Sequence, residues 1–215
     1  MGRSCVFQGE SQAVIGAQIG LDRFLAWRIP LAVATVHVPP KIDVEPVHSQ
    51  GEAWLLFAAA RLERLRLGGM TLRHKPQIAG WLIPCRIPGG RIGNWFLSAY
   101  SDDPLTVLAM RGIGLEASRC RIHHTATHIH AVGEVTAVVG RPIVVPELAW
   151  FTEDRCGLFP RWGGVLFLPL AKRRWAWQVH AGELQAPLAT RMQGRPVGVI
   201  DCSHDLALWG PPAAL

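Results

Sequence analysis

The stretch IAGWLIPCRIPGGRIGNWFLSAY, residues 78–100, is the sequence feature that most limits which folds this chain can adopt. It holds two runs rich in β-branched and aromatic residues, which are typical of strands. Between them stand Pro88, Gly89 and Gly90, and the glycines can supply the positive φ of a tight turn. The pattern predicts an antiparallel hairpin. Short apolar runs broken by glycine and proline recur along the chain without an internal repeat, so we expect a mainly β protein.

The segment SDDPLTVLAMRG, which follows this hairpin, carries the signals of a short helix. Asp102 or Asp103 can accept hydrogen bonds from the free backbone N–H groups of a first turn. Pro104 suits that first turn, and Gly112 suits the end of the helix. The sequence therefore predicts a helix over residues 104–111.

The segment SQGEAWLLFAAARLERLRLGG, residues 49–69, has a helical pattern, although its neighbours in the chain are predicted strands. Ser49 and Glu52 have the spacing of a capping box, and Gly68 suits a helix end. Its apolar residues fall on one helical stripe, formed by Leu55, Ala58, Ala59, Leu62 and Leu65. The pattern alone predicts a helix, whereas the neighbouring strands favour a strand.

Length and composition fit one domain over residues 1–215, because 215 residues, 49% of them hydrophobic, can bury a full core. The apolar runs IPLAVATVHVPP and GVLFLPLA are shorter than the roughly 20 residues that span a bilayer. No apolar segment follows the first residues as in a secretory signal. We therefore expect a cytoplasmic protein that does not bind membranes.

The cysteines and the basic residues give weaker signals. Five widely spaced cysteines without a C-x-x-C pair do not predict a zinc or disulfide framework, and only Cys120, beside two arginines, has neighbours that could activate a thiol. The net charge of +6 comes mostly from arginine. The basic and aromatic stretch KRRWAWQVH alternates as an amphipathic strand does, so we do not expect nucleic-acid binding.

Three stretches, NWFLSAYSDDPLTVLAMRGIGLEASRCRI, WFTEDRCGLF and CSHDLALWGPP, resemble an uncharacterised bacterial branch of the acetoacetate decarboxylase-like superfamily. Phe96 and Ser98, the P-L-x-V core of the predicted helix, and Ala117 with Arg119 match its pattern. Asp154 and the following arginine replace an expected Arg-Tyr pair. The resemblance covers about half of the chain. It implies a curved antiparallel β-barrel with a few short helices and a central cavity, in which residues 52–67 form a strand.

The resemblance does not bring the decarboxylase chemistry with it. That chemistry needs a lysine of lowered pKa, which forms an imine with the keto acid. The true enzymes use a lysine pair, where this chain has Arg119 and Arg121, and arginine stays protonated. If they lie two residues apart on a strand, these arginines share a face and could bind a carboxylate. Alternatively, they could lie exposed on the outer wall of the barrel. We therefore expect no cofactor and a carboxylated or carbonyl-bearing small-molecule ligand.

The stretch HHTATHIHAVGEV offers a different reading, as a metal site. On a regular strand His124, His128, His130 and Glu134 would share one face. Two imidazoles and one carboxylate can hold divalent iron, manganese or zinc, and the spacing is similar to the first metal motif of cupins. Both this face and the Arg119 face could point inward only if a bulge reset the alternation. Two other interpretations remain open. The histidines could line a solvent-exposed strand face without a metal, or the protein could be a noncatalytic structural or partner-binding protein.

Overall fold

The computed structural model describes residues 15–38, 45–67, 70–72, 75–86, 92–112, 114–125, 127–143, 155–158, 165–168, 174–179, 183–202 and 207–209. These residues form one sheet of sixteen strands and three short helices, so the fold is mainly β, as predicted. The strands are β1 (Ile15–Pro30), β2 (Glu45–Pro46), β3 (His48–Ser49), β4 (Glu52–Leu67), β5 (Met70–Leu72), β6 (Gln77–Arg86), β7 (Ile92–Ser101), β8 (Ala117–Arg119), β9 (Ile122–His124), β10 (His128–Ala131), β11 (Val135–Ile143), β12 (Arg155–Leu158), β13 (Val165–Leu168), β14 (Arg174–Val179), β15 (Arg195–Cys202) and β16 (Ala207–Trp209). The helices are α1 (Leu31–His37), α2 (Pro104–Gly112) and α3 (Pro187–Arg191).

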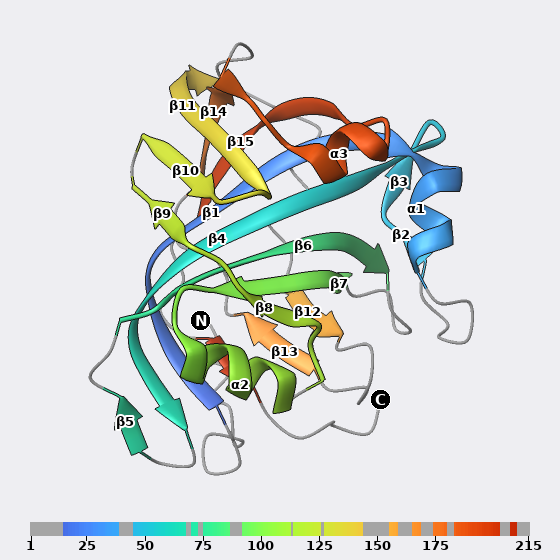
Figure 1. The fold of residues 1–215 in the computed structure, drawn as a ribbon. Helices are drawn as coiled ribbons and strands as arrows, with labels where there is room; N and C mark the ends of the chain where they lie inside the picture. Colours follow the sequence, from blue (N-terminus) through green and yellow to red (C-terminus); the bar gives the residue numbers. More distant parts are fainter. Residues whose placement is uncertain are drawn as a thin grey trace, which may run out of the picture.

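Two long strands, β1 and β4, run side by side across the molecule (Figure 1). They pair antiparallel along their whole length, from Ile15 opposite Leu67 to Pro30 opposite Glu52. From β4 the sheet continues through β6 and β7 to β12, and from β1 through β15, β14 and β11 to β10 and β9. The closed barrel and central cavity expected from the resemblance stay a prediction.

Of the two interpretations of residues 49–69, the helix is wrong and the strand implied by the resemblance is confirmed, because residues 52–67 form strand β4. Leu55, Phe57 and Ala59 pack into one core cluster, whereas Trp54 and Leu56 pack into another on the opposite face. A strand buried on both faces is apolar at nearly every position, and such a run also satisfies a helical stripe. The capping-box spacing belongs to a hairpin turn between β3 and β4, where Gln50 and Gly51 have φ values of 54° and 79°.

The predicted hairpin of residues 78–100 is confirmed. Strands β6 and β7 pair antiparallel from Ile78 opposite Ser101 to Arg86 opposite Ile92. The turn residues 88–90 lie outside the described residues.

The predicted helix of residues 104–111 is also confirmed, as α2 with one more residue. Asp103 begins it, since its carboxylate accepts hydrogen bonds from the backbone N–H and the hydroxyl of Thr106, each at 2.7 Å. This helix connects β7 to β8, which pairs parallel with β7 (Figure 1).

The main core cluster lies on one face of β1, β4 and β6. Alternate residues of these strands supply its largest members, Trp27, Phe57 and Trp81, all of which are almost completely buried. The Trp81 ring lies 5.3 Å from that of Trp27 and 4.9 Å from that of Phe57, measured between ring centroids. No helix among the described residues is long and apolar enough to cross a membrane.

Candidate functional site

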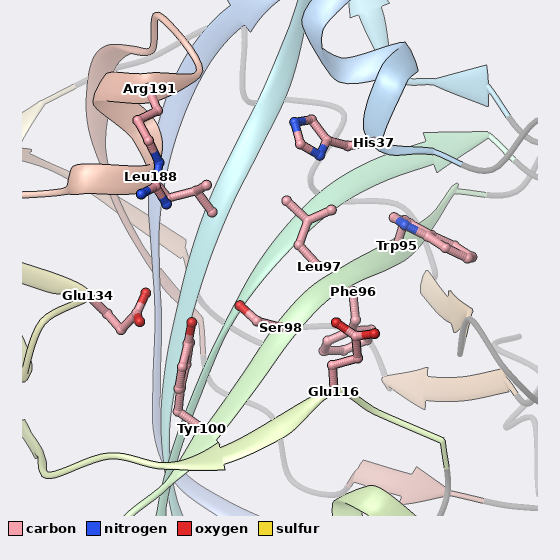
Figure 2. Close-up of a pocket in the computed structure, with 10 residues that line it drawn as sticks. All are labelled: His37, Trp95, Phe96, Leu97, Ser98, Tyr100, Glu116, Glu134, Leu188 and Arg191. Carbon is pink, nitrogen blue, oxygen red and sulfur yellow. The ribbon is translucent and has the colours of Figure 1, made fainter.

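A pocket of about 470 Å³ lies beside the main core cluster. Strand β7 supplies half of its wall, and α1, α3, the segment before β8 and the turn after β10 supply the rest (Figure 2). Its volume is within the range of small-molecule sites. The lining residues are His37, Trp95, Phe96, Leu97, Ser98, Tyr100, Glu116, Glu134, Leu188 and Arg191.

A bulge in β7 builds the pocket wall. Phe96 pairs with Leu82 and Ser98 pairs with Trp81, so Leu97 is an extra residue without an opposite partner. An extra residue resets the alternation of side chains along a strand. Trp95 before the bulge and Tyr100 after it consequently belong to the same core cluster, against which Leu97 also packs.

A chain of hydrogen-bonding groups lies at one end of the pocket. Trp81 Nε1 donates to Glu134 Oε2 at 3.0 Å. The pKa of Tyr100 is raised to about 12, chiefly by burial. A hydrogen bond with Ser98 lowers this pKa, and a hydrogen bond with Glu134 raises it. These signs indicate that Ser98 donates to the phenol oxygen and that the phenol donates to the Glu134 carboxylate. In Figure 2 the oxygens of Glu134, Tyr100 and Ser98 follow one another along this end.

A tight turn aims Glu134 at this chain. The Glu134 N–H donates to the carbonyl of Ala131 at 3.0 Å, which closes the turn between β10 and β11. Gly133 within the turn has a φ of +80°, a conformation that other residues rarely adopt. Glycine at this position therefore contributes to the placement of the carboxylate.

The rim of the pocket carries two basic side chains from different helices. His37 ends α1 and Arg191 ends α3, and both are exposed. Figure 2 shows both in the upper part of the pocket, where Leu188 lies beside the guanidinium of Arg191 and Leu97 lies below His37. The ten residues that line the pocket, all of them within the described part of the chain, include no lysine. Lys75 lies elsewhere, where its ammonium group pairs with Glu63 at 2.6 Å.

The two arginines predicted to bind an anion do not line this pocket. Arg119 and Arg121 are both exposed, and the residue between them, Cys120, is buried. Arg119 ends β8, and Arg121 lies between β8 and β9. Burial raises the pKa of the Cys120 thiol, which donates weakly to the carbonyls of Arg121 and Val132, both at 3.5 Å. A buried thiol of raised pKa is a structural residue rather than a nucleophile.

The predicted single strand through the histidines is wrong, since the chain folds back into a hairpin of β9 and β10. The Thr125 hydroxyl accepts from the N–H groups of Thr127 and His128, at 3.3 and 3.1 Å, and reverses the chain. His130 pairs across the hairpin with His123 on the exposed face, and Ile129 pairs with His124 on the buried face. The common face that the metal hypothesis required does not form.

The three proposed metal ligands also have separate partners. The rings of His128 and His130 are exposed and contact the hydroxyls of Thr127 and Thr136, at 2.8 and 2.9 Å. Glu134 is half-buried and binds Trp81. Within the described part of the chain, no three His, Cys, Asp or Glu side chains are close enough together to hold a metal ion.

Sequence reasoning included only part of the pocket. It named Glu134, as a metal ligand, and Ser98, as a family match, but it did not connect either with Tyr100, the one tyrosine of the chain. The H-A-V-G-E sequence, in which a glycine separates two strand-like runs, is a turn signal that could have placed Glu134 at a hairpin end. No sequence signal indicated that α3 would bring Arg191 to the same pocket.

No family model and no curated protein matches the chain. An acetoacetate decarboxylase from Legionella pneumophila has a similar structure, with a TM-score of 0.62, 16% identity and 93% of this chain and 86% of that chain covered. The enduracididine biosynthesis enzyme MppR, in complex with pyruvate, gives a TM-score of 0.59 at 17% identity, with 97% of this chain and 95% of that chain covered.

A third similar structure is an acetoacetate decarboxylase-like enzyme from Sphingomonas wittichii RW1. Its TM-score is 0.57 at 12% identity, and 98% of this chain and 97% of that chain are covered. At such low identities structural likeness establishes architecture and not activity. The comparisons thus confirm the resemblance seen in the sequence at the level of the fold: this chain has the acetoacetate decarboxylase-like fold.

Proposed function

We propose that this protein binds a small carbonyl-bearing organic acid in the β7 pocket, without forming an imine. The observation that carries the proposal is the composition of the lining, which combines a phenol donor, a carboxylate and an arginine but no lysine. We take this pocket as the interior cavity of the barrel that the resemblance implies.

The polar groups of the lining match the two functional groups of such an acid. The guanidinium of Arg191 offers paired donors that fit a carboxylate, and His37 lies on the same rim. The Tyr100 hydroxyl, which its raised pKa keeps protonated at neutral pH, can donate to a carbonyl oxygen. Leu97 and Leu188 line the same pocket and suit the carbon skeleton. That MppR has been captured with pyruvate supports this choice of ligand.

The absence of an imine is proposed on the chemistry of the lining. Imine formation requires an uncharged amine in contact with the carbonyl carbon. None of the ten lining residues has an amine. Lys75 is exposed, lies outside this lining and is paired with the Glu63 carboxylate. Lys41 and Lys172 lie outside the described residues.

A calorimetric titration of the protein with pyruvate tests the proposal. Tyr100→Phe removes the phenol donor alone, and Arg191→Ala removes the charge at the rim. We expect each to weaken binding by about tenfold or more, the usual effect of losing a hydrogen bond to a charged or carbonyl group.

The exposed arginines supply the control for this titration. If the anion site lies at Arg119 and Arg121, Arg121→Ala will weaken pyruvate binding and Arg191→Ala will not. The pocket proposal predicts the opposite. Loss of binding in neither variant, or no binding by the unchanged protein, would contradict the proposal.

A further inference from the structure

The hydrogen-bonding chain at the Tyr100 end of the pocket has a property that simple binding does not need. A phenol can donate one hydrogen bond, and Tyr100 donates it to Glu134. When a ligand carbonyl oxygen accepts the hydrogen bond of the phenol, the Glu134 carboxylate loses it. Glu134 then keeps the bond from Trp81 Nε1, at 3.0 Å, and loses the one from Tyr100. Ligand binding at Tyr100 therefore frees a lone pair on a Glu134 oxygen that lines the pocket, and this lone pair can accept a proton from the ligand.

We propose that Glu134 is a general base that removes a proton from the carbon next to the bound carbonyl, so that the pocket catalyses enolisation of its ligand. The inference rests on the proposed function, since it requires a carbonyl compound at Tyr100. It adds a reaction class, proton transfer at carbon, which uses no imine.

The step balances without a co-reactant. The C–H bond breaks and its proton moves to a Glu134 oxygen, while the electron pair forms a carbon–carbon double bond. The carbonyl π electrons move to the carbonyl oxygen, which becomes an enolate held by the Tyr100 hydroxyl. Ser98 donates to the phenol oxygen in turn and supports this donation. In the return step Glu134 gives a proton back to carbon, after exchange with solvent.

The surroundings of the two groups suit these roles. Tyr100 is 9% exposed, and a donor in a buried site stabilises developing charge more strongly than one in water. Trp81, which orients the carboxylate, is completely buried and fixed between Trp27 and Phe57. Glu134 is half-buried, so it can both reach the pocket and exchange its proton with water.

Proton exchange at the methyl group of pyruvate in heavy water, followed by NMR, tests this inference. The same spectra report binding, through broadening of the pyruvate signal. We expect the protein to accelerate exchange and Glu134→Gln to lower the rate by about 100-fold or more, the typical contribution of a general base. Glutamine keeps an oxygen that can accept from Trp81, so binding should persist. Glu183→Gln makes the same change at an exposed position outside the pocket and serves as the control.

Each outcome of the experiment separates the two proposals. Binding without accelerated exchange, or exchange that Glu134→Gln leaves unchanged, would overturn the enolisation inference and leave the proposed function standing. Exchange that is lost after treatment with pyruvate and borohydride would also overturn it, because that treatment traps an imine. No broadening at any pyruvate concentration would contradict the proposed function itself. Tyr100→Phe, which keeps Glu134, should slow exchange and weaken binding together.

Discussion

The buried imidazole of His124 should make the protein sensitive to mild acid. Its side chain is 4% exposed, and neither ring nitrogen has a hydrogen-bond partner among the described residues. The pKa of His124 is lowered from 6.5 to about 3, first by burial and then by the nearby charges of Arg23, Arg61 and His123. The folded protein therefore keeps this ring neutral where the unfolded chain protonates it.

The magnitude follows from the linkage between proton binding and folding. Between pH 6.5 and about pH 3 the unfolded state binds one more proton than the folded state, so stability is present above pH 6.5 and falls as the pH falls. One pKa unit corresponds to about 1.4 kcal/mol, so the His124 contribution to the free energy of unfolding at about pH 5 is lower by roughly 2 kcal/mol than at pH 7.

Urea unfolding of the unchanged protein and of His124→Leu, at both pH values, measures this contribution. Leucine cannot titrate, so its loss of stability between pH 7 and pH 5 should be smaller by about 2 kcal/mol. Other titrating groups are common to both proteins and cancel in the difference. His130→Ala, at an exposed position of the same hairpin, should behave as the unchanged protein does. An equal loss in the unchanged protein and in His124→Leu would refute the reasoning.

Three other predictions concern the site. Gly80→Ala places a methyl group 2.7 Å from the backbone oxygen of Ser98, so urea unfolding should show a loss of about 1–3 kcal/mol; unchanged stability would contradict this contact. Since Tyr100 is the one tyrosine, the ultraviolet absorbance of phenolate should titrate with a pKa of about 12, chiefly because of burial, and Glu134→Gln should lower that pKa; a value near 10 would contradict the burial, and an unchanged value in Glu134→Gln would contradict the bond to Glu134. Because the proposed metal ligands lie apart, His128→Ala should leave the metal content of protein purified without chelator unchanged, whereas loss of stoichiometric metal would restore the metal hypothesis.

The sequence was most informative where local chemistry decides the structure. The hairpin of β6 and β7 pairs two runs that are close in the chain, and α2 begins beside its own capping residue, Asp103. Strand β4 shows the opposite case, because a segment buried on both faces loses the alternation that identifies a strand. Its partners β1 and β6, which are distant in the chain, decide its conformation.

The site was less predictable because it depends on two small departures from regular strands. The turn at Thr125 changes which histidines share a face, and the bulge at Leu97 brings Trp95 and Tyr100 to the same side of β7. A single unpaired residue reverses the direction of every side chain beyond it, and no composition or spacing rule locates that residue.

The central claim, that the β7 pocket holds a carbonyl-bearing acid without forming an imine, is tested most directly by NMR of pyruvate labelled at its carbonyl carbon. One spectrum reports both binding and the chemical state of that carbon. We expect the ketone signal to broaden or shift in the presence of the protein, to return to its free position with Tyr100→Phe, and to remain a ketone throughout. A new signal in the imine region, matched by a borohydride-stable adduct on a lysine, would contradict the account, as would a ketone signal that the protein leaves unchanged.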